Sequence, residues 1–249
     1  MKMDAPTLAV LLIVFAATLI RSALGFGEAL FAVPLLALFL PLQVAAPLAV
    51  LVSVTIAAII VAQDWRRAEL RSAGWLLLAT LPGVPVGVLL LKSGHAAALK
   101  GALGALILAY SVWSLARRAP AEARGDSRTL LATCGFSAGV LGGAFGMNGP
   151  PLVLYGAMRG WPAQRFRATL QAYFLPASLV GMCAFWLAGL WTGTVTRDYL
   201  LSLPAMLPAV LLGRGINRRL HSTVFLRCVW LALCCIGAAL IAEALCGRA

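Results

Sequence analysis

Two glycine-rich stretches decide the fold: LGFGEALFAVPLL at residues 24–36 and GGAFGMNGPPLVL at residues 142–154. Each contains a Phe-Gly pair among further glycines, followed by a proline and an apolar run. Glycine and proline both disfavour the helix interior, so each stretch predicts a break between two helices. Matching breaks in the two halves of one chain indicate an internal repeat.

A second pattern supports the repeat. A proline, a glycine and a histidine recur with the same spacing and a constant offset of 126 residues: Pro82, Gly87 and His95, then Pro208, Gly213 and His221. Between the halves lies the polar stretch RRAPAEARGDSR at residues 117–128. We therefore expect a first repeat at residues 1–116, a cytoplasmic linker at 117–128 and a second repeat at 129–249, together forming one membrane domain.

The composition is that of an integral membrane protein. Hydrophobic residues make up 62% of the chain and charged residues 11%, against about 25% charged in a typical soluble domain. The mean hydropathy is +0.95. Apolar runs of near bilayer-spanning length recur throughout, which predicts an all-α polytopic fold. The ten expected segments are residues 6–20, 26–40, 42–62, 73–91 and 96–115, then 129–140, 150–158, 164–190, 199–212 and 224–245.

Loop charges bear on how the repeats are related. If the first two segments of each half form a hairpin, the loops 64–71, 117–128, 159–167 and 214–219 share one side and carry 13 basic residues, against 5 opposite. If each pair is instead one broken helix, the repeats are parallel and the numbers are 10 and 8. The positive-inside rule favours two inverted repeats, each a short-helix hairpin plus three transmembrane helices, with both termini periplasmic. The basic residues that give the net charge of +12 lie in short loops between apolar runs, where this topology explains them. We therefore expect no nucleic-acid partner.

The two motifs in their wider context carry a family resemblance. ALGFGEALFAVPLLALFLPLQVAAPLAVLVS at residues 23–53 and GVLGGAFGMNGPPLVLYGAMRGWPAQRFRATLQAYF at residues 139–174 resemble the TauE/SafE family of sulfite and organosulfonate exporters. The likeness covers essentially the whole chain. It implies a carrier in the bacterial inner membrane that moves sulfite or a small organosulfonate outward by alternating access.

The glycine breaks themselves suit an anion carrier. Helix starts present backbone N–H groups and a positive dipole end, and glycine lets a ligand approach them closely. We therefore expect Gly25, Gly27, Gly146, Asn148 and Gly149 to line a substrate site shared by both halves. The alternative is that the glycines only permit tight helix packing.

Arg21, Ser22 and Glu28 place polar groups beside the first break. An arginine at membrane depth usually faces a cavity or a partner. Arg21 could bind the anionic substrate, pair with Glu28 across the hairpin tip, or lie near the interface and extend its charge toward water. Glu28 could likewise couple transport to protons or serve as the structural partner of Arg21.

The helices after each hairpin carry further polar candidates. Ser53 belongs to the first half, and Gln171 and Tyr173 to the second when Pro41 is aligned with Pro162. Such side chains can donate hydrogen bonds to an oxyanion. They could instead hold neighbouring helices together.

Other function classes have weaker support. The G-x-S-x-G pattern around Ser137 could suggest an intramembrane hydrolase, but it lies in an apolar helical run, whereas that motif requires a strand-turn-helix elbow. A carrier for another anion or for a cation is the second alternative, although metal ions would require several acids or histidines at depth. The six cysteines lack metal-ligand spacing, and we expect no metal and no cofactor.

Overall fold

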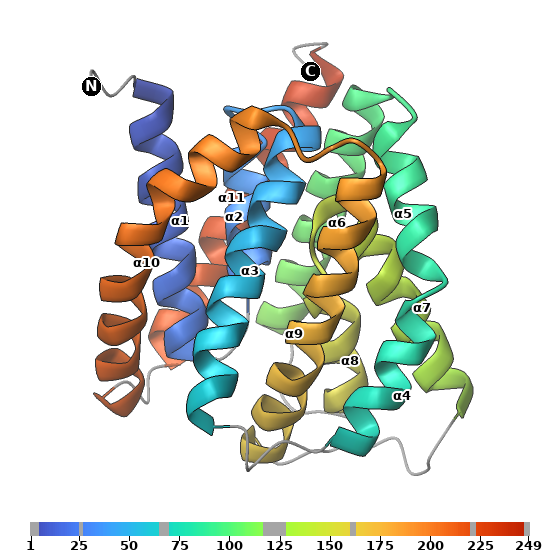
Figure 1. The fold of residues 1–249 in the computed structure, drawn as a ribbon, viewed down its shortest axis with the longest axis vertical. Coiled ribbons are helices and arrows are strands. Elements are labelled where there is room, and N and C mark those ends of the chain that lie inside the picture. Colours follow the sequence, from blue (N-terminus) through green and yellow to red (C-terminus); the bar gives the residue numbers. More distant parts are fainter. Residues whose placement is uncertain are drawn as a thin grey trace.

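The computed structural model describes residues 5–24, 27–64, 70–116, 128–159, 163–219 and 223–246. These residues form eleven helices joined by turns, which confirms the all-α class (Figure 1). The helices are α1 (Ala5–Leu24), α2 (Glu28–Leu36), α3 (Leu42–Asp64), α4 (Leu70–Thr80), α5 (Gly83–Lys92), α6 (Ala96–Ala116), α7 (Arg128–Phe145), α8 (Gly149–Met158), α9 (Ala163–Leu187), α10 (Gly193–Arg219) and α11 (Thr223–Leu245).

Several helices are long and apolar enough to cross a bilayer. Within the described residues, α3, α6 and α10 each contain such a span, and α4 with α5 forms another that is bent by 43°. The bend lies at Pro82, which has no backbone N–H to continue the helix. The expected apolar segment at 73–91 is thus present as two helices with a bend between them.

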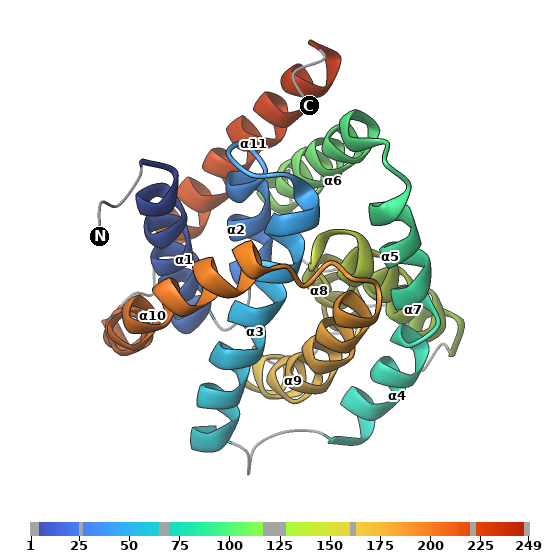
Figure 2. The same cartoon turned by 45° about the horizontal axis from the view of Figure 1, so that its top comes forward.

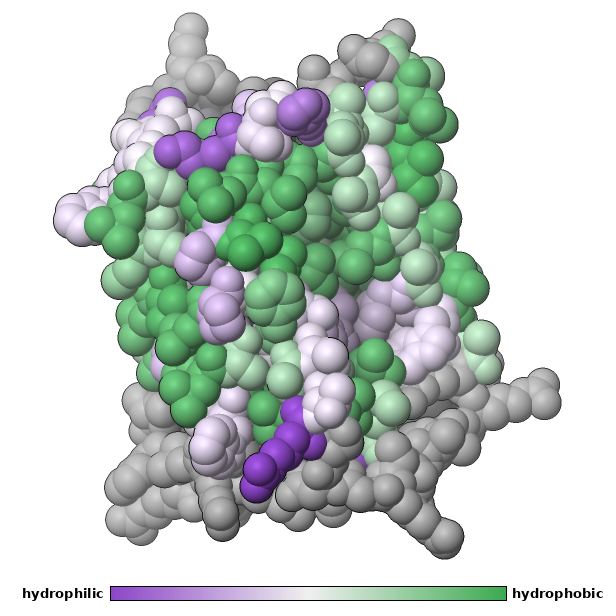
Figure 3. Space-filling model, turned by 90° about the vertical axis from the view of Figure 1, so that its right-hand side faces the viewer, coloured by the Kyte–Doolittle hydropathy of each residue, from purple (hydrophilic) through white to green (hydrophobic). Residues whose placement is uncertain are grey.

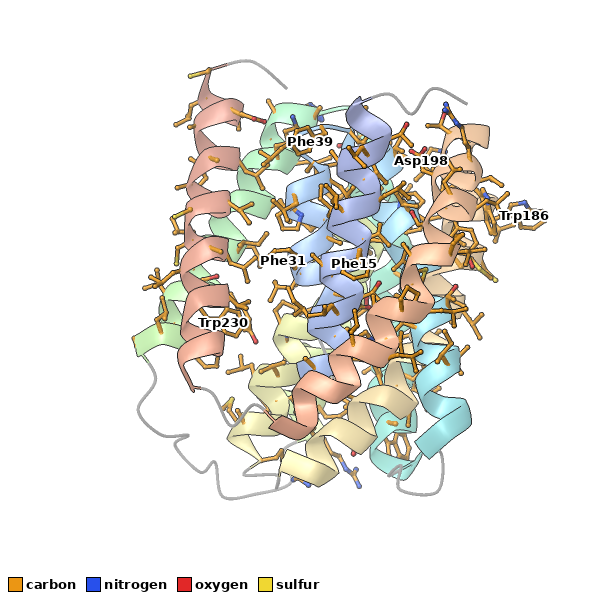
Figure 4. The ribbon with its side chains drawn as sticks, turned by 90° about the vertical axis from the view of Figure 1, so that its left-hand side faces the viewer. Phe15, Phe31, Phe39, Trp186, Asp198 and Trp230 are labelled. Atoms are coloured by element: carbon orange, nitrogen blue, oxygen red, sulfur yellow. The ribbon has the colours of Figure 1, made fainter. Side chains whose placement is uncertain are left out.

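The surface is suited to lipid. Figure 3 shows one face with hydrophobic residues across its middle and the most hydrophilic ones near its two ends. Trp186 points away from the bundle in Figure 4 and is 66% exposed, and Leu211 is 67% exposed. Contiguous apolar surface of this kind is unusual on a soluble monomer and is expected where side chains contact acyl chains.

The predicted segments correspond closely to the observed helices. The largest differences are in α10, which begins at Gly193 rather than at residue 199 and ends at Arg219 rather than at residue 212, so Asp198 lies inside the helix. Pro204 and Pro208 also lie within α10, which continues past both. A proline thus ends a helix at Pro82 but not in α10.

The two halves interlock. α1 packs along α10, and its counterpart α7 packs along α4 and α5; α3 contacts α9, and α6 contacts α11. Counterparts run in opposite directions in Figure 1, where α3 and α10 descend while α9 and the α4–α5 pair ascend. Both marked ends of the chain lie at the top of that view. Every major helix pairing therefore joins one half to the other.

Glycines allow α7 to cross α4 and α5 at very short distance. A Cβ atom added to Gly139 would lie 2.2 Å from the carbonyl oxygen of Thr80, and one added to Gly87 would lie 2.1 Å from that of Val140. The helix includes Ser137, which is exposed on its outer side. The G-x-S-x-G pattern is thus part of a helix-packing face and not of a nucleophile elbow.

The repeat-related glycines Gly87 and Gly213 make equivalent contacts. An added Cβ would lie 2.1 Å from the carbonyl oxygen of Val140 at Gly87 and 2.7 Å from that of Leu19 at Gly213. Leu19 and Val140 are 121 residues apart, the same offset that relates Pro41 to Pro162. Aligning the two halves with this offset, which we call the 121-residue register, places Arg21 opposite Gly142 and Glu28 opposite Gly149.

Candidate functional site

Both glycine-rich breaks border one small cavity. Its volume of about 20 Å³ is sufficient for a single water molecule. Figure 2 shows α2, α3 and α8 in the middle of the bundle, and residues of all three helices line the cavity. The lining residues come from the start of α2, from the turn before α8 and from four other helices: Gly27, Glu28, Ala29, Leu30, Gly146, Met147, Asn148, Gly149, Pro150, Val153, Ser53, Tyr110, Phe174 and Ser178.

Two of the lining glycines have backbone conformations that require glycine. Gly27, before α2, has a φ of 99°, and Gly146, before α8, has a φ of 66°. At Gly146 an added Cβ would also lie 2.9 Å from the carbonyl oxygen of Ala46 in α3. The turns therefore hold the helix starts against the core, where other residues would be strained.

The two helix starts differ in the donors they present. Glu28, Ala29 and Leu30 form the first turn of α2, and all three carry backbone N–H groups. The first backbone hydrogen bond of the helix is donated by the Phe31 N–H to the carbonyl oxygen of Gly27. α8 begins Gly149-Pro150-Pro151, and neither proline has an N–H to donate. The start of α2 therefore presents more backbone donors than the start of α8.

A buried polar network lies at the α2 side of the cavity. Arg21 forms an ion pair with Glu28 and donates from Nη1 to the Ser53 hydroxyl at 2.8 Å. Ser53 donates to Glu28 Oε1 at 2.6 Å and accepts from the Ser178 hydroxyl at 3.1 Å. The Arg21 guanidinium also lies 5.1 Å from the centre of the Phe174 ring, within the range of a cation–π contact.

Burial excludes one of the three interpretations of Arg21. The residue is 0% exposed, and Glu28 and Ser53 are each 4% exposed. A side chain that reached the membrane interface could not be fully enclosed, so the interfacial interpretation is wrong. The pairing with Glu28 is confirmed. Removing one member of a buried pair costs about 3–5 kcal/mol, because the other charge is left uncompensated.

The second half closes its hairpin without charges. Gly142, the counterpart of Arg21, has no side chain, and an added Cβ would lie 2.7 Å from Asn148 Oδ1. The Asn148 side chain hydrogen-bonds the Tyr173 hydroxyl, which also lies 2.7 Å from the Thr80 hydroxyl. A neutral carboxamide thus takes the place that the Arg21–Glu28 ion pair occupies in the first half.

Most of the predicted site residues lie together. The structure places six of them on the cavity wall: Gly27, Glu28, Ser53, Gly146, Asn148 and Gly149. Arg21 and Tyr173 contact this wall through the hydrogen bonds above. Ser22 does not line the cavity, since its Cβ faces Gly213 of α10.

Four of the predictions concern residues that are not fully described. Gly25, His221 and residues 117–127 of the linker lie outside the described residues. Gln171 belongs to α9, but its side chain is not among those described.

Sequence reasoning missed four residues. Phe174, Ser178 and Tyr110 line the cavity from helices that were expected to be mainly apolar. The 121-residue register could have identified Phe174, because it is the counterpart of Ser53. Asp198, in α10, is a further buried acid at 7% exposed, and Figure 4 places it toward the upper end of the bundle.

Comparisons with known proteins cover most of the chain. The family model described as Sulfite exporter TauE/SafE matches residues 10–240, a region that includes both glycine-rich motifs. A relative from Cupriavidus necator, named "Probable sulfite/organosulfonate exporter TauE", is 29% identical over 185 residues, which cover 73% of this chain and 70% of the relative. No solved structure matches the chain with significance.

Proposed function

Because this chain belongs to the sulfite exporter TauE/SafE family, we propose that it exports sulfite or a small organosulfonate across the bacterial inner membrane by alternating access. Family membership makes it a multi-pass membrane transporter and not an enzyme. One observation carries the finer proposal: glycine-rich breaks from both halves border one small cavity beside a fully buried arginine.

The cavity chemistry suits an oxyanion. Arg21, Ser53 and Ser178 offer side-chain donors, and the first turn of α2 offers backbone N–H groups and a positive dipole end. The three oxygens of a sulfite or sulfonate group accept such hydrogen bonds. A cavity of about 20 Å³ is too small for either ion, so binding requires the two hairpins to separate.

We further propose that the halves are inverted repeats around this cavity. The opposed directions of counterpart helices and the exchange of packing partners between halves support this relation. The lower end in Figure 1, where α3 and α10 end and α4 and α9 begin, adjoins the basic loops and is assigned to the cytoplasm. Both termini are then periplasmic.

A cation carrier has less support. Glu28 is the acidic residue among the cavity-lining residues that the structure describes, and it is paired with Arg21. Among the described residues, no three histidine, cysteine, aspartate or glutamate side chains gather as a metal site. Coupling of anion movement to protons is expected to involve the same Glu28.

Transport in proteoliposomes tests the proposal. Vesicles containing the purified chain are loaded with labelled sulfite, ethanesulfonate or sulfate, and efflux is followed with and without a pH gradient. We expect saturable efflux of sulfite or ethanesulfonate that protein-free liposomes lack. If no sulfur oxyanion moves in any condition, the proposed function is wrong.

The Tyr173 hydroxyl is expected to position Asn148 for substrate. In Tyr173→Phe, the loss of its hydrogen bonds should weaken anion affinity about threefold, the equivalent of about 0.6 kcal/mol. Tyr199→Phe is the matched control, because it removes a similar bond to Thr55 (2.6 Å) between α10 and α3, away from the cavity wall. Affinity is measured by equilibrium binding of ethanesulfonate, and equal affinities in the two variants would contradict the positioning role.

A further inference from the structure

We infer that Glu28 is a tethered competitor of the transported anion: its carboxylate occupies the substrate's donors in the empty carrier and leaves them, protonated, when the anion binds. This inference rests on the proposed function and assigns a mechanism of coupling to the same cavity. It predicts that about one proton enters the site with each monovalent anion.

The hydrogen bonds of Glu28 are those that an oxyanion substrate would use. A single oxygen, Oε1, is bound by both Arg21 and Ser53. Ser178 donates to Ser53 and so supports the same group of donors from α9. A sulfonate oxygen placed in this position would meet the same guanidinium and hydroxyl, so substrate and carboxylate cannot both occupy it.

The position of Glu28 in α2 strengthens the similarity between its carboxylate and a bound substrate anion. Glu28 is the first residue of the helix, and the preceding Gly27 provides no side-chain cap. An anion at a helix start is stabilised by the positive dipole end and the unpaired N–H groups. The carboxylate thus lies where the helix would also favour a bound anion.

Charge balance explains why a proton must enter. The charges of Arg21 and Glu28 cancel while the cavity is empty. The other polar side chains that line the cavity are uncharged: Ser53 from α3, Ser178 from α9, Tyr110 from α6 and Asn148 before α8. An added anion would leave a net negative charge among side chains that are almost fully buried, which is costly. A proton transferred from water to the Glu28 carboxylate restores neutrality, and it returns to water when the anion leaves.

The second half makes the coupling asymmetric. In the 121-residue register, Gly142 and Gly149 stand where the first half has Arg21 and Glu28. The second hairpin is closed by the neutral Asn148 side chain. One exchangeable carboxylate therefore serves the whole cavity, consistent with one proton in each cycle.

The test uses the purified full-length chain and ethanesulfonate, which remains a monoanion between about pH 5 and 8 while sulfite does not. For the wild type, we expect affinity to rise as pH falls, and we expect about one proton to be taken up per bound anion in weakly buffered solution. Glu28→Gln should bind at least about tenfold more tightly at pH 7.5, with affinity independent of pH and no proton uptake. Glu243→Gln, which removes an acid paired with Lys100 away from the cavity wall, is the control and should behave as the wild type.

A second measurement guards against misfolding of Glu28→Gln, which leaves Arg21 without its carboxylate. Ethanesulfonate should raise the melting temperature of this variant more than that of the wild type, because the anion replaces the lost partner. Wild-type binding without proton uptake would overturn the inference and leave the proposed function standing, and so would unchanged pH dependence in Glu28→Gln. Absence of ethanesulfonate and sulfite binding in both proteins would overturn both.

Discussion

Replacing Arg21 with glutamine is expected to abolish anion transport. The guanidinium is the fully buried cation beside the cavity, and its hydrogen bonds converge on the position assigned to the substrate. Removing one member of a buried charge pair at a binding site costs about 2–5 kcal/mol, which corresponds to a loss of affinity of about 30-fold to several thousand-fold. Equilibrium binding of ethanesulfonate and its efflux from proteoliposomes measure this loss.

Two variants separate anion binding from folding in this experiment. Arg21→Gln with Glu28→Gln removes both charges, so the chain should fold without a buried uncompensated charge but should still fail to bind. Arg197→Gln alters an exposed arginine at the start of α10 and should transport as the wild type. Transport by Arg21→Gln within threefold of the wild-type rate would assign Arg21 to structure alone.

Adding one methyl group at Gly139 is expected to destabilise the fold. In Gly139→Ala the new Cβ would lie 2.2 Å from the Thr80 carbonyl oxygen, and because this contact is with backbone, α4 and α7 must move apart. Overpacking of this kind costs about 1–3 kcal/mol, which should lower the apparent melting temperature in detergent by several degrees.

Gly74→Ala is the matched control for this substitution. Gly74 also lies in a helix, α4, but an added Cβ would meet nothing within 4 Å. Its melting temperature should be unchanged or slightly higher, since alanine is the better helix former. Equal melting temperatures for the two variants would show that the α4–α7 crossing is looser than the structure indicates.

The helices were largely predictable, and the exceptions have a common cause. Apolar runs and charged loops mark spanning segments because lipid excludes charges and unpaired backbone groups. A proline in such a segment does not always end the helix, since neighbouring helices can satisfy the carbonyl groups that lose their hydrogen bonds. For this reason the break at Pro82 and the continuation of α10 through Pro204 and Pro208 could not be distinguished in advance.

The candidate site was predicted in its outline and not in its contacts. The glycine breaks were expected to converge, and Gly27, Gly146, Asn148 and Gly149 all line the cavity. Ser178 was missed because an isolated serine in an apolar helix does not reveal which face it occupies. Phe174 and Tyr110 were missed because aromatic residues in such helices usually contact lipid or the core.

By itself the sequence determined that this chain is an all-α membrane protein, because hydropathy can be read from the chain alone, and its glycine–proline spacing predicted two related halves. Only the tertiary structure decided that Arg21 is paired with Glu28, that Ser53 and Ser178 join them, and that Ser22 faces α10 instead. The physical reason is that these contacts join α1, α2, α3 and α9, and the partner of a buried charge depends on how separate helices pack.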